Sequence, residues 1–431
     1  MIRLDTQDAG FAAAFGELVD ARRESDADVA RDVQVILRAV RDDGEAAVAA
    51  FTKQFDGHDL SETGWRIEPA DCRTAYEALE PELRAALDLA AARIRAYHEK
   101  QKPTDTDYVD AQGVRLGARW TAVDAAGIYV PGGRAAYPSS LLMNAIPAKV
   151  AGVERLVMAT PTPKGEINHL VLAAAHLAGV DEVWRVGGAQ AIGALAYGAG
   201  RIQRVDVVTG PGNAWVAEAK RQVYGMVGID MVAGPSEIVV VADGRNDPDW
   251  IAADLLSQAE HDTVTQSILF TDDADFAERV AEAVDRQIPE LATASVARTA
   301  WDANGAIIVV DSLEAAMPLV DRLAPEHLEL AVDDPQGLFD RVRHAGSVFL
   351  GRHTPEAIGD YVAGPNHVLP TGRRARFASG LSVLDFMKRT SFLGLTETAL
   401  NELGPATVAL AHAEGLPAHA KSVALRLRLN R

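Results

Sequence analysis

The stretch that decides the fold begins at the apolar run Leu156-Val157-Met158-Ala159 and continues to Val208. Helical and strand-like patterns alternate after this run, in the order helix 169–179, strand 183–186, helix 189–197 and strand 205–208. Such alternation of short strands with helices is typical of parallel strands joined by crossover connections. The sequence therefore predicts an α/β domain built on a parallel sheet.

A second block of the same kind starts at Glu237. Its expected elements are strand 237–242, helix 249–260, strand 267–270, helix 275–287, strand 306–311, helix 313–323 and strand 347–350. Two such blocks predict two nucleotide-fold-like domains that face each other.

The segments outside the two blocks carry other patterns. Residues 27–42, 44–55 and those from Pro81 onward have apolar side chains at helical spacing, and residues 113–123 alternate as in a strand. The last segment, from about Leu381, has helical patterns but too few residues for a core of its own. We expect it to pack as a tail on another domain or on another subunit.

Composition limits the class of protein. A chain of 431 residues is long enough for about two to four domains, and 24% charged residues is ordinary for a globular protein. The formal net charge of −19 argues against a nucleic-acid-binding surface, which needs clustered Lys and Arg. A local basic pocket can still form around Arg373, Arg374 and Arg376.

The single cysteine, Cys72, excludes an intrachain disulfide and a thiolate metal cage, and it fits a reducing compartment. The N-terminus has no basic-then-apolar signal, and no uninterrupted apolar run is long enough to span a bilayer. We therefore expect a cytoplasmic protein without a membrane partner.

Four polar residues form a candidate metal-ligand set. Gln258 and His261 stand three residues apart at the end of a predicted helix, so their side chains project from one face. With Asp360 and His419 they supply two imidazoles, one carboxylate and one amide. Zinc accepts such ligands, and the lack of thiolates leaves manganese, iron or cobalt open. The alternative is an ordinary polar pair on an exposed helix.

Glu326 and His327 form a candidate acid–base pair directly after Pro325. A carboxylate beside an imidazole supplies two bases with different proton affinities near neutral pH. Adjacent residues on a helix point about 100° apart, so we expect the pair to line a cleft at a helix end or in a loop. The alternative is an exposed acidic turn with a solvated histidine.

Three glycine loops follow predicted strands, and none has the GxGxxG dinucleotide pattern. They are Val130-Pro131-Gly132-Gly133, Val186-Gly187-Gly188-Ala189-Gln190 and Thr209-Gly210-Pro211-Gly212-Asn213. The second and third stand between a strand and a helix, where backbone amides can contact phosphates, although each alone is also typical of a tight turn. Ser236, in Ala233-Gly234-Pro235-Ser236-Glu237, precedes the second block and can donate or accept a hydrogen bond there.

Taken together, these segments resemble the histidinol dehydrogenase family. The similarity runs in order from about Tyr129 to His419, and the segments are jointly specific although each is unremarkable alone. The segments that carry it are GPGN at 210–213, AGPSE at 233–237, SQAEHD at 257–262, APEHLEL at 324–330 and GDYVAGPNHVLPT at 359–371, with Glu414 and His419.

The resemblance implies an activity and a fold. The activity is a four-electron oxidation of L-histidinol, through a histidinal-level intermediate, to L-histidine with two NAD and one water, as the last step of histidine biosynthesis. The fold is α/β, with two related, incomplete Rossmann-like domains (aldehyde-dehydrogenase-like), an N-terminal helical arm and a small C-terminal tail. We accordingly expect an arm at 1–25, a discontinuous first domain at 26–128 and 238–380, a second, NAD-contacting domain at 129–237, and a tail at 381–431.

The resemblance also implies a homodimer with shared active sites, in which the tail completes the partner's site through Glu414 and His419. It implies one zinc ion per subunit, which holds the amino and imidazole nitrogens of the substrate. The ligands that match are Gln258, His261, Asp360 and His419.

The remaining roles follow from the same resemblance. His327 matches the base that takes the alcohol proton, and Glu326 matches the residue that activates water. The residues that match substrate contacts are Ser236, His367 and Glu414, together with His327 and the four zinc ligands. The residues that match NAD contacts are Tyr129, Gln190 and Asn213.

Two other functions are open at this point. A related dehydrogenase of another primary alcohol, such as a sulfonated diol, would keep the scaffold, the zinc ligands and the Glu/His pair. Glu414 suits a cationic or imidazole-bearing substrate and would repel a sulfonate, so histidinol is favoured. A non-catalytic, metal-dependent assembly or binding protein would need neither Glu326 nor His327, and both are present.

Overall fold

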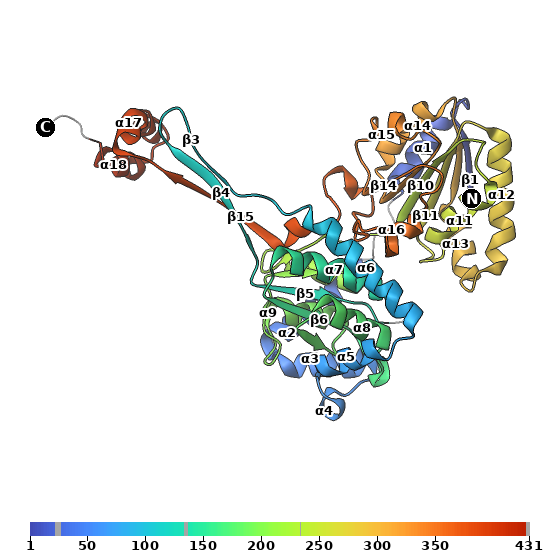
Figure 1. Cartoon of the computed structure of the whole chain (residues 1–431), viewed down its shortest axis with the longest axis horizontal. Helices are drawn as coiled ribbons and strands as arrows, with labels where there is room; N and C mark the ends of the chain where they lie inside the picture. The colour runs from blue at the N-terminus through green and yellow to red at the C-terminus, as the bar shows by residue number, and fades with distance from the viewer. Residues whose placement is uncertain (22–26, 133–136, 233, 428–431) are drawn as a thin grey trace. The chain divides into compact units, whose positions relative to one another are not determined.

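The computed structural model describes residues 1–21, 27–132, 137–232 and 234–427 (Figure 1). The chain divides into two compact units. The first unit comprises Met1–Gln101 and Asp124–Phe386, and the second comprises Lys102–Val123 and Met387–Arg431.

The first unit contains two six-stranded sheets. One of them, called the first sheet below, has the order β2 (Arg66–Ile67), β7 (Glu182–Trp184), β6 (Arg155–Ala159), β5 (Ala125–Tyr129), β8 (Val207–Thr209), β9 (Gly228–Ile229). Its strands are parallel except β2, which pairs antiparallel with β7. The chain passes from β5 to β6 and β7, then returns to the other side of β5, so the strand order reverses between β5 and β8.

Helices cover both faces of this sheet, and its strands are apolar because they are buried on both sides. One core contains side chains of α2 (Ala27–Asp43), α3 (Glu45–Asp56), α9 (Gly188–Tyr197) and α10 (Ala214–Val223). The remaining helices are α4 (Leu60–Thr63), α5 (Pro69–Glu77), α6 (Pro81–Glu99), α7 (Pro138–Ala151) and α8 (His169–Ala178), of which α7 contacts β5 and β6 and packs against α8.

The second sheet of this unit is fully parallel. Its order is β1 (Ile2–Asp5), β12 (Ala306–Val309), β11 (Gln266–Thr271), β10 (Glu237–Ala242), β13 (His327–Ala331), β14 (Ser347–Leu350). The chain passes from β10 to β11 and β12, then returns to the other side of β10 for β13 and β14. The two sheets therefore have the same strand order, each with a reversal beside its first central strand.

Two cores lie on the two faces of the second sheet. Phe15 and Leu18 of α1 (Phe11–Asp20) pack on one face with α14 (Leu313–Leu323) and α15 (Gln336–Phe339). The other face is covered by α11 (Pro248–Ala259), α12 (Ala274–Gln287) and α13 (Ala294–Asn304). A short helix, α16 (Glu356–Tyr361), contacts α11, and single 3-10 turns lie at Pro163–Gly165, Ile288–Glu290, Arg374–Arg376 and Val383–Phe386.

The second unit is an antiparallel three-stranded sheet with two helices. The strands have the order β15 (Met387–Gly394), β4 (Arg115–Ala122), β3 (Thr106–Val109). The helices α17 (Glu397–Ala413) and α18 (Pro417–Ala424) pack against each other beyond the end of the β4–β15 ribbon (Figure 1).

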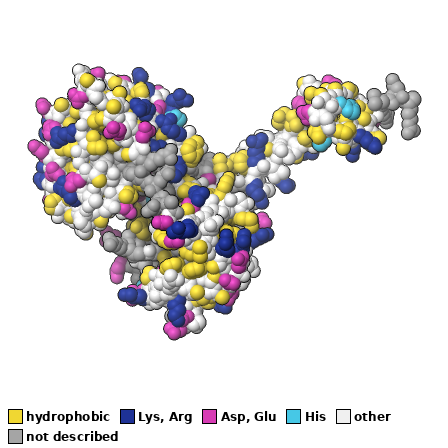
Figure 2. All heavy atoms as spheres, turned by 180° about the vertical axis from the view of Figure 1, so that it is seen from behind, with side chains coloured by type: hydrophobic (Ala, Val, Ile, Leu, Met, Phe, Trp, Pro, Cys, Tyr) yellow, Lys and Arg dark blue, Asp and Glu magenta, His cyan; other side chains and the backbone are white. Residues whose placement is uncertain are grey.

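Two surface properties complete the description of the fold. Basic and acidic side chains are interspersed over the face of the first unit shown in Figure 2. Among the described residues, no helix combines the length and the apolarity needed to cross a membrane.

The structure confirms the α/β class and the alternating elements of both predicted blocks. The predicted domain boundaries are wrong. The predicted arm at 1–25 is not separate, because β1 pairs with β12 in the second sheet and α1 packs on one face of that sheet. Residues 26–128 do not join 238–380, because β2 and β5 belong to the sheet with β6 to β9. The tail predicted at 381–431 starts too early, because residues up to Phe386 belong to the first unit. It also contains a strand, β15, whose mostly exposed side chains give no apolar pattern.

Candidate active site

The acid–base pair lies where two central strands of the second sheet begin. His327 is the first residue of β13 and is in register with Ile238 of β10, while Glu326 directly precedes the strand. Both side chains are buried. The prediction of a helix end or a loop is therefore wrong for His327, because Glu329 interrupts the apolar run and hides a fully buried strand.

The ring of His327 has oxygens on one side only. Its Nδ1 lies 3.2 Å from Oε1 of Gln258 and 3.3 Å from the carbonyl oxygen of Glu237. Oε1 of Glu356 lies at an ion-pair distance of 3.2 Å. Nε2 is buried and has no hydrogen-bond partner among the described residues. Burial lowers the pKa of His327 to about 3, which favours the neutral ring. The acceptor oxygens of Gln258 and Glu237 at Nδ1 favour the tautomer with its hydrogen on Nδ1 and a lone pair on Nε2.

Glu326 is held by the start of the neighbouring strand. Its Oε2 accepts the backbone N–H of Glu237 at 3.1 Å, and its carboxyl also hydrogen-bonds the side chain of Ser236. Burial raises the pKa of Glu326 well above its ordinary value, and the nearby charges of Glu237 and Asp360 act in the same direction. The pair thus combines a weakly basic imidazole and a strongly basic carboxylate in one buried site.

The predicted metal ligands of the first unit lie close to this pair. Nε2 of Gln258, in the last turn of α11, is 3.1 Å from Nδ1 of His261. Asp360, on α16, lies in a group with His327 and Glu356 whose candidate ligand atoms are all within 4.8 Å of one another. Burial raises the pKa of Asp360 to about 6. Amide, imidazole and carboxylate donors of this kind fit zinc.

Glu356 is a residue that the sequence analysis missed. It is buried in the first turn of α16, and its Oε1 has no hydrogen-bond partner among the described residues. The signal was present in the sequence, because Glu356 stands four residues before Asp360 and residues at that spacing share a helix face.

Two further acids, also missed by the sequence analysis, lie behind Glu356. The carboxyl of Glu329 accepts the backbone N–H of Glu356 and hydrogen-bonds Asp254. Burial raises the pKa of Glu329 well above its ordinary value and that of Asp254 to about 6. Ser257 donates to Oε2 of Glu356 at 3.4 Å. The site therefore continues into a buried acidic cluster.

His367 packs beside Asp360. Its Nδ1 is 3.0 Å from the backbone oxygen of Asp360, and its Nε2 is 3.3 Å from the hydroxyl of Ser140. Burial lowers the pKa of His367 to about 4. Both ring nitrogens thus have protein partners, and a substrate contact for His367 stays a prediction.

The predicted NAD residues lie at the carboxyl edge of the first sheet. Tyr129 ends β5, Gln190 is in the first turn of α9, and Asn213 caps the N-terminus of α10. The hydroxyl of Tyr129 accepts the N–H of Gly188 at 3.1 Å. Tyr129 and Asn213 flank the reversal between β5 and β8, which is where parallel α/β sheets bind nucleotides.

Two buried side-chain oxygens at this edge, Oε1 of Gln190 and Oγ1 of Thr209, have no partner among the described residues. Buried polar atoms are almost always hydrogen-bonded in native proteins, so these oxygens fit an edge that receives a polar ligand. Gly133 and Ala233, in two of the predicted loops, lie outside the described residues.

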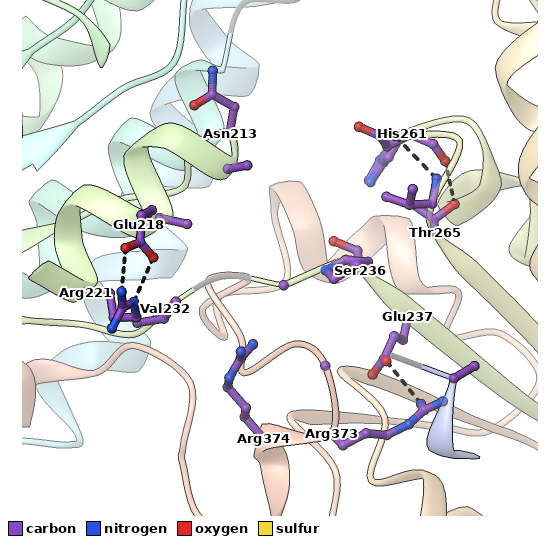
Figure 3. A pocket seen from close by; sticks show the side chains of 18 of the residues that line it. Asn213, Glu218, Arg221, Val232, Ser236, Glu237, His261, Thr265, Arg373 and Arg374 are labelled. Carbon is purple, nitrogen blue, oxygen red and sulfur yellow. Dashed lines mark hydrogen bonds and ion pairs between the residues drawn. The ribbon is translucent and has the colours of Figure 1, made fainter. Parts of the chain in front are cut away.

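A cavity of about 1310 Å³ in the first unit is lined by Asn213 at the start of α10 and by Ser236 and His261 at the second sheet (Figure 3). The basic residues singled out in the sequence, Arg373, Arg374 and Arg376, also line it. Arg373 forms an ion pair with Glu237 at 3.1 Å, so the positive charge of this arginine is partly neutralised. The remaining predicted residues, Glu414 and His419, lie in the second unit, and their roles stay predictions.

The two sheets are built mainly of parallel strands, polar residues lie at a strand-order reversal, and an acid–base cluster is buried at the second sheet. These features define an α/β enzyme. A family model described as histidinol dehydrogenase matches residues 19–427, and the chain belongs to this family of NAD-dependent oxidoreductases. The predicted resemblance is thereby confirmed.

Similar proteins agree over nearly the whole chain. Histidinol dehydrogenase of Zymomonas mobilis subsp. mobilis is 63% identical over 427 residues, covering 99% of both chains. Histidinol dehydrogenase of Rhodospirillum rubrum is 61% identical, covering 99% of this chain and 98% of the relative. The crystal structure of histidinol dehydrogenase from Elizabethkingia anophelis matches with a TM-score of 0.93 at 34% identity, covering 99% of this chain and 98% of the other.

Proposed function

We propose that the chain oxidises L-histidinol to L-histidine through a histidinal-level intermediate, with two NAD and one water, as the last step of histidine biosynthesis. Family membership supports the reaction class. The observation that carries the chemistry is the His327 ring, whose Nδ1 faces three oxygens while its buried Nε2 has no partner among the described residues.

His327 acts in the alcohol oxidation. Its Nε2 accepts the hydroxyl proton while a hydride leaves the substrate carbon for NAD, and positioned proton transfer of this kind contributes roughly 10²- to 10⁴-fold to a rate. The ring is suited to this role because Nδ1 is already committed to the oxygens of Gln258 and Glu237.

Glu326 acts in the aldehyde oxidation. Its carboxylate removes a proton from the one water molecule that attacks the aldehyde-level intermediate. Burial makes this carboxylate a stronger base than an exposed glutamate and keeps bulk water away from the aldehyde. The N–H of Glu237 and the hydroxyl of Ser236 orient the carboxyl for this step.

We further propose one zinc ion per subunit, with Gln258, His261 and Asp360 as ligands and His419 as the fourth. A zinc ion held by these residues would supply Lewis acidity and would position the nitrogen-bearing substrate. The 3.1 Å approach of Gln258 to His261 and the grouping of Asp360 with His327 support this assignment.

For NAD, we propose contacts with Tyr129, Gln190 and Asn213 at the carboxyl edge of the first sheet. Two observations support these contacts: the strand-order reversal, and Oε1 of Gln190, which has no hydrogen-bond partner in the part of the chain that the structure describes. We also propose a homodimer in which the whole second unit, including β15, brings Glu414 and His419 to the partner's site. Ser236, His367 and Glu414 would contact the substrate.

Steady-state assays with L-histidinol and with a sulfonated diol, each with NAD, test the proposal. We expect two NADH per L-histidinol and no turnover of the diol, because Glu414 repels a sulfonate. Turnover of the diol alone would identify a related primary-alcohol dehydrogenase instead. Elemental analysis of the same preparation should find one zinc per subunit.

A further inference from the structure

The loop 210–213, between β8 and α10, is held by a buried ion pair. Its first residue, Gly210, donates its backbone N–H to Oδ2 of Asp230 at 2.9 Å, and its carbonyl oxygen accepts from Nζ of Lys220 at 2.9 Å. Nζ of Lys220 also forms an ion pair with Oδ1 of Asp230. The two charged side chains thus hold both backbone polar groups of one glycine.

The two charged residues come from the elements that flank the loop. Lys220 is in the last turn of α10, seven residues after Asn213, which caps the start of the same helix. Residues at this spacing share a helix face, and helical side chains lean toward the N-terminus, so the long lysine side chain reaches back to the loop. Asp230 directly follows β9, which pairs with β8.

The stability of the fold does not by itself explain this pair. The side chains of Lys220 and Asp230 are only 3% and 1% exposed. Removing two charges from water opposes folding, and their mutual attraction offsets this effect only in part. Apolar side chains of similar volume often give equal or greater stability. A need to fix the loop in one conformation does explain the pair, because both partners bond to the same glycine.

The loop joins two residues that are proposed to contact NAD. At its start, Gly210 approaches the backbone of Tyr129 so closely that a Cβ would collide with the carbonyl oxygen. At its end, Oδ1 of Asn213 accepts two backbone N–H groups of α10 at 3.1 and 3.2 Å. The polar group that Asn213 can offer to a ligand is therefore its Nδ2 amide. Asn213 lies beside the cavity at the start of α10 (Figure 3), so the path of the loop sets the position of this amide.

We propose that Lys220 and Asp230 are positioning residues for NAD: by holding the N–H and the carbonyl group of Gly210, they fix the path of the loop and direct the Asn213 amide toward the cofactor. The inference rests on the proposed contact of Asn213 with NAD. In this role neither charged side chain touches NAD or the substrate. Their loss should therefore weaken NAD binding and leave kcat at saturating NAD nearly unchanged.

The competing role is purely structural, with the pair acting only on the stability of the fold. A double variant, Lys220→Met with Asp230→Leu, separates the two roles. Either single change leaves one buried charge without its partner, which destabilises strongly. The double change removes both charges and should recover part of that stability. It does not restore the hydrogen bonds to Gly210, so NAD binding should remain weak.

The test measures the Kd for NAD of the full-length protein by titration calorimetry and the free energy of unfolding by urea. We expect the Kd of the double variant to be roughly tenfold higher than that of the wild type, because the Asn213 hydrogen bond is misplaced. The kcat at saturating NAD, the KM for L-histidinol and the zinc content should be nearly unchanged. Lys220→Met should bind NAD about as weakly as the double variant, although it is less stable.

Three matched variants complete the comparison. Arg352→Met breaks a largely buried ion pair at the carboxyl edge of the second sheet, so it should lose stability with the Kd for NAD unchanged. Asn213→Ser removes the proposed contact but keeps an oxygen that can cap α10, and it should weaken NAD binding at least as much as the double variant. Asp230→Asn keeps the shape but has one acceptor oxygen in place of two, so it should weaken NAD binding by a smaller factor. It carries the comparison if the double variant does not fold.

The proposal is overturned if the folded Lys220 and Asp230 variants bind NAD as the wild type does while Asn213→Ser binds it more weakly. It is also overturned if NAD affinity recovers together with stability in the double variant, or if Arg352→Met weakens NAD binding equally. An unchanged Kd in Asn213→Ser would instead refute the proposed NAD contact of Asn213, and the inference with it.

Discussion

The two sheets of the first unit share a strand order but place their polar side chains at opposite edges. In the first sheet, the carboxyl edge at the β5–β8 reversal carries Tyr129, Asn213 and Gln190, whose Oε1 has no partner among the described residues. In the second sheet, Glu326 and His327 lie at the amino edge, where β10 and β13 begin. A strand-order reversal is therefore a possible ligand-binding position in both sheets, and the residues at the strand ends determine whether a ligand can bind there.

The corresponding carboxyl edge of the second sheet is closed by ion pairs. Arg352, which follows β14, contacts Asp243 at 2.7 Å and Asp333 at 2.5 Å. Arg245 contacts the same two carboxylates at 2.9 and 2.7 Å. Asn246 donates to the carbonyl oxygen of Ala331 at 2.7 Å. These contacts occupy the reversal between β10 and β13, whereas Oε1 of Gln190 and Oγ1 of Thr209 at the corresponding edge of the first sheet have no partner among the described residues.

The largest expected effect is on chemistry at the amino edge of the second sheet. His327→Asn should lower kcat with L-histidinol by roughly 10²- to 10⁴-fold, because the base is removed while the metal ligands remain. NADH formation measures kcat, and elemental analysis measures the retained metal. Unchanged alcohol oxidation would contradict the assignment of the base.

The closed carboxyl edge should matter for stability alone. Arg352→Met should lower the free energy of unfolding by about 3 kcal/mol, because it leaves Asp243 largely buried without its main partner. Urea unfolding measures this loss, and kcat of the folded variant should remain near the wild-type value. Arg245→Met is the control, since this more exposed arginine should contribute less than about 1 kcal/mol. A large loss of kcat in Arg352→Met would show that this edge takes part in catalysis.

The backbone conformation at the carboxyl edge of the first sheet, where NAD is proposed to bind, requires glycine at position 210. Its φ is +116°, and a Cβ there would lie 2.1 Å from the carbonyl oxygen of Tyr129. Gly210→Ala should therefore destabilise the fold by about 1–3 kcal/mol and raise the KM for NAD more than the KM for L-histidinol. Gly225→Ala is the matched control for backbone strain, with φ +99° and open space around its Cβ. Equal changes in both KM values would contradict an NAD site at this edge.

The smallest expected effect is a pH dependence of the free energy of unfolding, which comes from Asp56 beside the first sheet. Burial raises the pKa of Asp56 to about 6 from 3.8, so the folded state holds this proton more tightly than the unfolded state. Stability from this group is present below about pH 4 and is lost as the pH rises through 6. Asp56→Asn should therefore be more stable than the wild type at pH 8, by about 1–2 kcal/mol, with the difference vanishing near pH 4. Urea unfolding at both pH values decides this, and an equal difference at the two would refute the assigned cause.

Local patterns allowed most helices and strands of the two sheets to be predicted, because buried strands and amphipathic helices leave apolar periodicity in the sequence. Pairings between distant segments leave no such trace. The pairing of β1 with β12 joins Ile2 to Ala306, and nothing local to either strand identifies it. The exposed strand β15 was missed for the complementary reason, since it has almost no buried face.

The site was predictable to the extent that its residues are close in sequence. The spacing of Gln258 and His261 placed them on one helix end, and the structure brings them together. The spacing of Glu356 and Asp360 carried the same kind of information. By contrast, the contact of Asp254 with Glu329 arises only when α11 packs against the sheet. Their spacing in the sequence therefore does not predict this contact.

Complementation between inactive subunits tests the central claim most directly, namely that the amino edge of the second sheet is completed by the second unit of a partner. His327→Asn and His419→Asn are purified separately, mixed in equal amounts and allowed to exchange subunits. Heterodimers then contain one intact site, so activity should rise to about one quarter of the wild-type value. If subunits exchange and activity stays at the level of the parents, the shared site does not exist.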